Sequence, residues 1–278
     1  MDPSRSHDLD DATARMLELH EMAAQAGPRR SVRDLGDMIL LADPLDADPF
    51  VNRASALRFP ADPRGFDARL DQLVVLFATL DRRPHVWSSP LGATPSDLPR
   101  RLCVNGFTLV GESRVMAVEG AHRSVPAVPG GMRVRCVSGP GDAGTSAACD
   151  EAAAILAAVF PGADADRLSV ELAASLGEAG HAIYLVDARV DGMTRPVAVA
   201  RAYAAGGLMY LSSIGTLPEW RGRGIAGGLV AAAATDGVAS GARLTYLSVE
   251  SGNAAAERVY AGLGFRPVGR PVGRFLAW

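Results

Sequence analysis

Apolar residues recur at helical spacing in two stretches of the first half of the chain. These stretches run from residue 8 to 26 and from residue 66 to 80, with apolar side chains three or four positions apart. This spacing places them on one face, so we predict two amphipathic helices. Short apolar runs near prolines predict strands, and a further run predicts a short helix. The strands are expected at 37–41, 54–59, 85–88, 108–110 and 115–118, and the short helix at 96–103.

The second half has longer periodic segments. Helices are predicted at 147–160 and 165–176, on either side of a Pro-Gly pair. Strands are predicted at 133–137, 182–190, 197–203, 208–214 and 244–249. The turn that starts at Asp191-Gly192 is typical of a β-hairpin. These elements together predict a mixed α/β (α+β) fold.

A proline- and glycine-rich segment, 125–131, divides the two halves. We therefore predict one domain over 1–125, a linker over 126–131 and a second domain over 132–278. The length of 278 residues and the 48% hydrophobic content are enough for two cores.

The stretch 214–229 combines a proline, two arginines and several glycines between a strand-like run and an alanine-rich run. Glycine allows tight bends and close approach of a ligand to the backbone. A glycine-rich turn that opens a helix also presents unpaired N–H groups at the positive end of the helix dipole. Arg221 and Arg223 lie where cations are disfavoured, and a bound polyanion would remove that conflict. We therefore predict an anion site, most simply for a pyrophosphate.

Two known patterns fit this stretch. One is the dinucleotide-binding pattern Gly222-x-Gly224-x-x-Gly227, with Glu250 near the position of a ribose-binding carboxylate. The other is Arg221-x-x-Gly224-x-Ala226, which resembles the coenzyme A pyrophosphate motif of the GNAT acyltransferase superfamily. Too few residues follow Ser251 for a doubly wound dinucleotide fold, which favours the second pattern.

A second motif strengthens the resemblance to the GNAT superfamily. About 30 residues downstream, Asn253, Tyr260 and the pair Gly264-Phe265 occur in the order of the closing GNAT motif. The resemblance covers 132–278. The first half has a parallel order of elements and its own Gly106-Phe107 pair, but no coenzyme motif. It resembles a degenerate GNAT copy in a tandem form, with an unrelated α/β cap as the alternative.

The resemblance implies the fold and the coenzyme site. Each half is expected to have a mixed, mostly antiparallel sheet flanked by helices, and the second half a splayed parallel strand pair. Acetyl-CoA is the expected co-substrate. Backbone groups of Ile214, Gly215 and Thr216 would pair with its pantetheine arm. Its pyrophosphate would be held at Arg221, Gly222, Arg223, Gly224, Ile225, Ala226 and Gly227.

The resemblance also implies roles for three residues of the closing segment. Tyr260 occupies the position of the proton donor to the departing thiolate, although an aromatic residue there could simply be core. Asn253 would contact the coenzyme or serve as a plain N-cap. Some relatives carry a glutamate base at the position of Ser248, and Glu250 lies on the same strand face. Glu250 is therefore the candidate base, or else a solvated strand-end carboxylate.

Composition and charge argue against several classes of binding partner. A net charge of −3, with no lysine in the sequence, does not suggest nucleic-acid binding. No segment is apolar enough to span a membrane, and Cys103, Cys136 and Cys149 have no metal spacing. We expect reduced thiols, a cytoplasmic location, no metal, and a monomer or homodimer. The scattered histidines, His85 among them, are expected to be surface or structural residues.

The leading hypothesis is an N-acetyltransferase that acts on the primary amine of a small molecule by direct attack in a ternary complex. Asp164, Asp166 and Glu171 could attract a cationic acceptor. A second hypothesis is a non-catalytic acyl-CoA-binding or regulatory protein, because Ser248 replaces the base. A third is an NAD-binding oxidoreductase.

Overall fold

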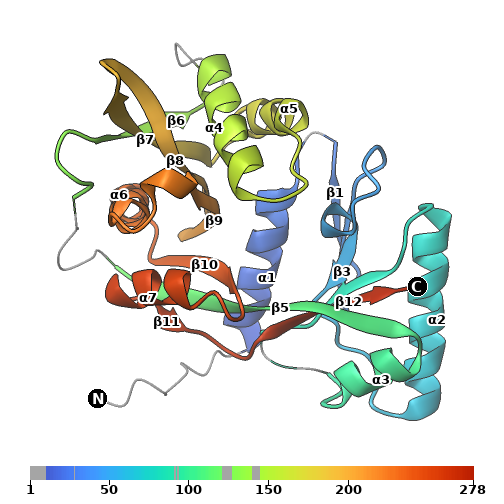
Figure 1. The fold of residues 1–278 in the computed structure, drawn as a ribbon. Helices are drawn as coiled ribbons and strands as arrows, with labels where there is room; N and C mark the ends of the chain where they lie inside the picture. Colours follow the sequence, from blue (N-terminus) through green and yellow to red (C-terminus); the bar gives the residue numbers. More distant parts are fainter. Residues whose placement is uncertain (1–10, 28, 91, 93, 121–126, 140–144) are drawn as a thin grey trace. The chain divides into compact units, whose positions relative to one another are not determined.

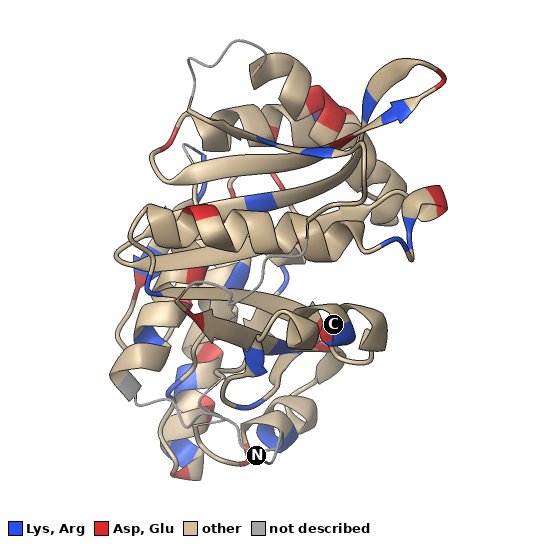
Figure 2. Ribbon diagram, turned by 90° about the vertical axis from the view of Figure 1, so that its left-hand side faces the viewer, with Lys and Arg blue, Asp and Glu red and all other residues tan. Residues whose placement is uncertain are grey.

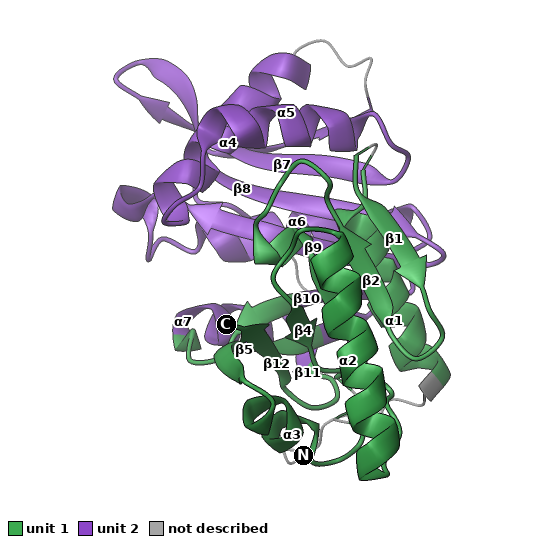
Figure 3. Ribbon diagram, turned by 90° about the vertical axis from the view of Figure 1, so that its right-hand side faces the viewer, with its two compact units in different colours: residues 1–116, 248–254, 267–278 green, residues 117–247, 255–266 purple. Residues whose placement is uncertain are grey.

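The computed structural model describes residues 11–27, 29–90, 92, 94–120, 127–139 and 145–278 (Figure 1). The chain forms two compact units (Figure 3). Unit 1 contains residues 1–116, 248–254 and 267–278, and unit 2 contains residues 117–247 and 255–266. Unit 1 thus takes two short segments from the C-terminal part of the chain. The boundaries of the functional domains, at 125 and 132, stay a prediction.

Unit 1 is built on a sheet with the strand order β1-β2-β3-β4-β12-β5. The strands are β1 (Ser31–Asp34), β2 (Ile39–Ala42), β3 (Arg53–Ser55), β4 (His85–Trp87), β12 (Val272–Ala277) and β5 (Phe107–Glu119). The β3–β4 pair is parallel, and the other neighbours are antiparallel. The helices are α1 (Asp11–Gln25), α2 (Pro63–Thr79) and α3 (Leu98–Val104), with the 3-10 turn η1 at Pro49–Val51.

The core of unit 1 follows from the predicted apolar pattern. Phe66, Leu70, Leu73 and Phe77 lie one helical turn apart on α2 and are buried against the sheet. Asp62 caps the first turn by accepting a hydrogen bond from the Gly65 amide at 2.7 Å. The predicted helix over 66–80 is therefore confirmed, with its start moved upstream by this cap.

The strands of unit 1 differ from the prediction in two places. β1 was not predicted, and the strands expected at 108–110 and 115–118 form one continuous strand, β5. Gly111 lies between those two runs and would favour a turn by composition alone. In the structure it pairs with Arg274 of β12, whose guanidinium lies where a β-carbon on Gly111 would be. Contact with a distant strand thus keeps β5 extended through the glycine.

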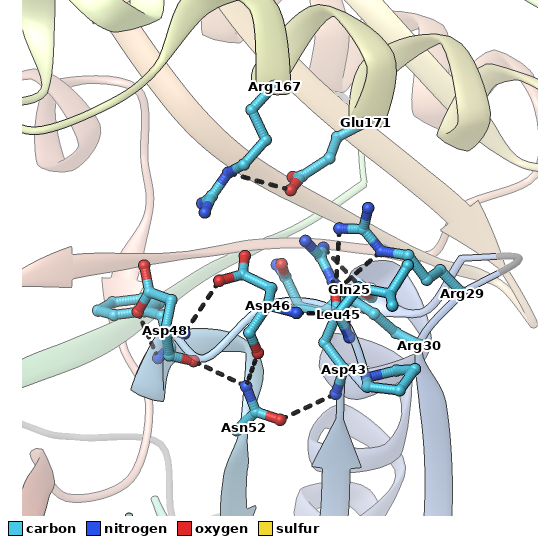
Figure 4. A network of polar contacts seen from close by, with 12 residues as sticks. Gln25, Arg29, Arg30, Asp43, Leu45, Asp46, Asp48, Asn52, Arg167 and Glu171 are labelled. Carbon is cyan, nitrogen blue, oxygen red and sulfur yellow. Dashed lines mark hydrogen bonds and ion pairs between the residues drawn. The ribbon is translucent and has the colours of Figure 1, made fainter. Parts of the chain in front are cut away.

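A buried carboxylate organises the loop after β2 (Figure 4). Asp43 accepts hydrogen bonds from Arg29 and Arg30 at 3.1 and 3.0 Å, and from the amides of Leu45 and Asp46 at 2.9 and 3.1 Å. Burial alone would raise the pKa of Asp43, but these hydrogen bonds lower it overall. These hydrogen bonds tie the loop to the segment before β1, which gives the cluster a structural role.

Unit 2 has a sheet with the strand order β10-β9-β8-β7-β6. The strands are β6 (Arg133–Ser138), β7 (His181–Val190), β8 (Met193–Ala205), β9 (Leu208–Thr216) and β10 (Leu244–Glu250). β6 to β9 are antiparallel neighbours, and β9 and β10 are parallel over Leu208–Leu211 and Leu244–Leu247. The predicted hairpin turn is present, with positive φ at Asp191 (50°) and Gly192 (80°).

Helices cover both faces of this sheet. They are α4 (Thr145–Val159), α5 (Ala165–Leu176), α6 (Ile225–Ala239) and α7 (Ala254–Gly262), with η2 at Pro218–Trp220 and the short strand β11 at Arg266–Pro267. α4 and α5 pack on a layer that includes Ile183, Leu185 and Val199. α6 is tan along most of its length in Figure 2, because Asp236 is its one charged residue. Three of its six alanines are buried. The mixed, mostly antiparallel fold expected from the sequence is confirmed.

The two Gly-Phe pairs have the same local geometry. Gly106 follows α3 with φ 83°, and Gly264 follows α7 with φ 90°. This left-handed conformation ends a helix and favours glycine. The next residue is buried in each case, with Phe107 at 3% and Phe265 at 0% exposure. The correspondence inferred from the dipeptides therefore extends to backbone conformation and burial.

Candidate active site

The end of β9 contains a bulge that the sequence did not reveal. Opposite β8, Val199 pairs with Gly215 and Arg201 pairs with Ser212, so Ser213 and Ile214 face a single residue. Ser213 has φ 49°, a conformation that costs a residue with a β-carbon about 1 kcal/mol or more. Bulges interrupt the regular hydrogen bonding of a strand. The predicted pantetheine segment therefore begins inside a distorted stretch of strand.

The segment after β9 is a glycine turn that opens α6. Gly224 is the residue before the helix and has φ 78°, and no side chain caps the helix. The first helical hydrogen bond runs from the Gly228 amide to the Gly224 carbonyl at 3.1 Å. The amides of Ile225, Ala226 and Gly227 precede it and have no partner within the helix. Free amides at a helix start are the kind of group that can bind an anion.

Two exposed guanidinium groups flank this terminus. Arg221 donates to the Thr216 carbonyl at 3.1 Å, and Arg223 donates to the Glu219 carbonyl at 3.2 Å. Arg223 also lies over the Trp220 ring at 4.8 Å. These contacts brace the turn without neutralising it, since neither guanidinium has a carboxylate partner in the described part of the chain. The local charge is positive and suits a pyrophosphate.

The backbone near the bulge is closely packed on one side. A β-carbon on Gly215 would contact Val159 of α4 at 3.3 Å. The Thr216 hydroxyl is buried and has no hydrogen-bond partner in the described part of the chain. A buried hydroxyl without a partner is costly, and a polar ligand group could satisfy it. This group and the free amides of α6 fit the expected coenzyme.

Tyr260 lies on α7 and is 7% exposed. Its ring lies against Phe265 at a centroid distance of 6.1 Å. Burial raises the pKa of the Tyr260 hydroxyl to about 12. The hydroxyl is therefore protonated at neutral pH and can donate a proton.

In unit 1, Glu250 is the last residue of β10 and forms an ion pair with Arg274 of β12. The Glu250 side chain is 52% exposed, whereas Arg274 is largely buried and lies 5.6 Å from the rings of Phe50 and Trp87. Arg274 was not considered from the sequence, because nothing in a local pattern links it to Glu250. Its presence means that the candidate base is held by a positive charge.

The remaining candidate residues occupy positions at helix starts or within a helix. Asn253 directly precedes α7, as expected for a helix-opening residue, and its amide donates to the Glu250 carbonyl at 3.0 Å. Asp164 caps α5 by accepting from the Arg167 amide at 2.8 Å. Glu171 pairs with Arg167 at 3.6 Å on the same helix. Asp164 and Glu171 therefore have structural partners of their own.

The structure shows whether the cysteines are free thiols and whether His85 is buried. The three cysteines are free thiols, as expected, with Cys149 buried. His85 is structural rather than a surface residue: it is 3% exposed and lies 2.7 Å from the Pro49 carbonyl through Nδ1. Trp87 donates to its Nε2 at 3.2 Å.

Residues 150–265 match the model of the acetyltransferase (GNAT) family. This part of the chain is a GNAT acetyltransferase domain. The match spans α4 to Phe265 and includes the glycine turn and Tyr260. The chain therefore contains an acyltransferase domain of the GNAT type, and the resemblance inferred for this part of the sequence is confirmed. The antiparallel β6 to β9 also argue against the doubly wound NAD-binding fold.

Solved structures extend the similarity to nearly the whole chain. A GCN5-related N-acetyltransferase from Kribbella flavida is 24% identical with a TM-score of 0.70, and 95% of each chain is covered. One from Sphaerobacter thermophilus is 21% identical with a TM-score of 0.60, and the match covers 95% of this chain and 91% of that chain. At these identities the similarity shows a shared fold.

A third structure is named as a tandem protein. It is a tandem GNAT protein from the clavulanic acid biosynthesis pathway, 16% identical with a TM-score of 0.60, and the match covers 96% of this chain and 95% of that chain. No curated protein matches the chain. Among the described residues, no helix has both the length and the apolar character needed to cross a membrane.

Proposed function

We propose that this acyltransferase moves an acetyl group from acetyl-CoA to the primary amine of a small molecule, by direct attack in a ternary complex. The observation that carries the proposal is the turn at 221–227. In this turn, amides without a partner in the helix lie beside two guanidinium groups, and the described residues provide no carboxylate partner for either group. Bound acetyl-CoA would supply an acyl carbon activated as a thioester.

Different residues of unit 2 would bind different parts of the coenzyme. Amides of Ile225 to Gly227, with Arg221 and Arg223, would hold the pyrophosphate. The backbone of Ile214 to Thr216 would pair with the pantetheine arm. The Thr216 hydroxyl would gain a hydrogen-bond partner that the described residues do not provide. The bulge at Ser213 supports a further role, since an amide released from regular pairing can donate to a developing oxyanion.

Proton transfer would involve Tyr260 and Glu250. Tyr260 is protonated at neutral pH and would give its proton to the departing thiolate. Glu250 would accept a proton from the amine, directly or through water. Its ion pair with Arg274 holds the carboxylate in one place. Asn253 would contact the coenzyme from the start of α7.

We also propose that 132–278 is the catalytic domain and that 1–125 is a degenerate copy without a coenzyme site. The equal geometry at Gly106 and Gly264 supports an internal repeat. The full-length similarity to a tandem GNAT protein also supports it. A cytoplasmic location remains part of the proposal, because the three thiols are free.

Calorimetric titration with acetyl-CoA tests the coenzyme site. The wild-type chain is expected to bind, and Gly224→Glu is expected to abolish binding, because a carboxylate would meet the pyrophosphate and the new β-carbon would strain φ 78°. Gly192→Glu is the matched control: it adds the same charge at φ 80° in a hairpin turn and should bind normally. Absence of heat for the wild type at millimolar acetyl-CoA would refute the proposal.

A non-catalytic acyl-CoA-binding role is the alternative that one observation favours. The Glu250 carboxylate is already engaged in an ion pair with Arg274, so an amine would have to compete with that guanidinium for it. Release of free thiol from acetyl-CoA, measured with a panel of primary amines, separates the two functions. Binding without thiol release for any amine would support the alternative.

A further inference from the structure

Unit 2 contains a cavity that the proposed reaction does not use. It has a volume of about 840 Å³ and lies among the ends of α5 and α6 and the strands β6 to β9. α6 is 15 residues long, so its C-terminal end is about 22 Å from the glycine turn at its N-terminus. Met209 lines the cavity near the start of β9, whereas the bulge and Thr216 are near its end. The cavity is therefore separate from the coenzyme site.

The polar groups in this cavity are acidic or neutral. Asp236 and Glu178 provide carboxylates, and no arginine lines the cavity in the part of the chain described here. α5 ends at Leu176 and α6 at Ala239, and both of these residues line the cavity. The C-terminal ends of helices carry partial negative charge, so two of them add to the two carboxylates. The electrostatic environment favours a cation.

Two buried polar side chains face the same space. Tyr184 is 3% exposed and lies beside Cys136 and Asp236; burial above all, and then these two neighbours, raises the pKa of its hydroxyl. His181 is 8% exposed and packs on Tyr203 at 4.6 Å between ring centroids. Burial above all, and then the charge of Arg201, lowers the pKa of His181 to about 4. The imidazole is therefore neutral at pH 7 and adds no positive charge.

The remaining lining is small and apolar. Alanines and glycines of β7, β8 and α6 leave room where larger side chains would fill the space. They are Ala182, Ala202, Ala204, Gly237 and Ala239. The volume lies in the range of small-molecule pockets, and a few polar groups surrounded by apolar surface are typical of them.

We propose that this cavity binds a small organic amine in its cationic form, with the ammonium group at Asp236 and the apolar body against the alanines of β7 and β8. The site needs no coenzyme and does not depend on the proposed acyl transfer. The ligand class follows from three features together: the carboxylates, the two helix ends and the apolar lining.

Cys136 allows a local test, because it lines the cavity and is exposed. In a Cys103→Ser background it is the exposed thiol, whereas Cys149 is buried. The probe is benzylamine at pH 7, and the reagent is methyl methanethiosulfonate, which modifies thiols and spares amines. Benzylamine at about ten times its Kd is expected to slow labelling of Cys136 about tenfold by mass action. Benzyl alcohol and benzoate are expected to give no protection.

Three variants locate the bound amine. Asp236→Asn should raise the Kd of benzylamine by about tenfold or more, the effect of losing a hydrogen bond to a charged group. Ala182→Leu should remove protection by filling the cavity. Asp191→Asn, an exposed carboxylate in the β7–β8 turn, should leave protection intact. Labelling of buried Cys149 reports any variant that has unfolded.

The proposal is overturned if benzylamine gives no protection in the folded wild type, if benzyl alcohol protects equally, or if Asp236→Asn retains full protection. Gly224→Glu should be protected like the wild type. Failure of acetyl-CoA binding with intact protection would overturn the proposed function and leave this site standing.

Discussion

At the scale of single residues, Tyr260 carries the sharpest chemical prediction. The buried hydroxyl carries a proton at neutral pH, as a donor to the departing thiolate must, and burial raises its pKa to about 12. Tyr260→Phe is expected to lower kcat about 100-fold and to leave the KM for acetyl-CoA nearly unchanged, because the lost proton matters in the transition state. Steady-state kinetics measure both constants. Tyr203→Phe is the control, and equal kcat for Tyr260→Phe and the wild type would remove the role.

His85 gives a prediction for stability. Burial, with smaller contributions from Arg53 and Arg274, lowers its pKa to about 4, and its Nε2 accepts from Trp87. In the unfolded chain His85 takes up a proton below about pH 6.5, whereas in the native chain it does so only near pH 4. The free energy of unfolding should therefore decrease as the pH is lowered from about 6.5 to about 4, by about 1.4 kcal/mol per pH unit for each such histidine.

Urea unfolding at several pH values between 6.5 and 4.5 checks this prediction. His85→Gln should flatten the dependence and leave the part due to His181, whose pKa is also lowered to about 4. An unchanged slope in the variant would show that His85 does not titrate as described.

At the scale of elements, the bulge in β9 stores backbone strain. Ser213 has φ 49°, where glycine is not penalised. Ser213→Gly should raise the free energy of unfolding by up to about 1 kcal/mol. Ser212→Gly, one residue earlier and without a positive φ, should lower it by about 0.5–1 kcal/mol, because glycine weakens an ordinary strand. Opposite signs are the expected result in chemical denaturation, and equal signs would contradict the strain.

At the scale of the whole molecule, the C-terminal strand belongs to unit 1. β12 pairs with both β4 and β5. Removal of residues 272–278 should leave these two strands without a shared partner and expose Phe275, which is 2% exposed. Hydrogen exchange of β4 and β5 amides should rise by several orders of magnitude, whereas the β7–β8 hairpin of unit 2 should keep its protection. Unchanged exchange in β4 and β5 would contradict this assignment.

The sequence by itself determined the elements with strong local signals. Helices α2, α4, α5 and the Asp191-Gly192 hairpin follow from periodicity and turn chemistry, which depend on neighbours a few residues away. The glycine turn before α6 was predictable for the same reason: its φ at Gly224 and its free amides are local properties. The family of the second half also followed, because its motifs lie in short segments.

Tertiary structure decided what depends on distant contacts. Gly111 stays in a strand because Arg274, far along the chain, packs over it, and the same arginine holds Glu250. The bulge at Ser213 requires the register of β8, and the cavity at Asp236 requires two helix ends to meet four strands. None of these has a local sequence signal, since each depends on which backbone lies opposite. Local chemistry therefore determined the elements and the glycine turn, and packing determined which charged groups and cavities lie around them.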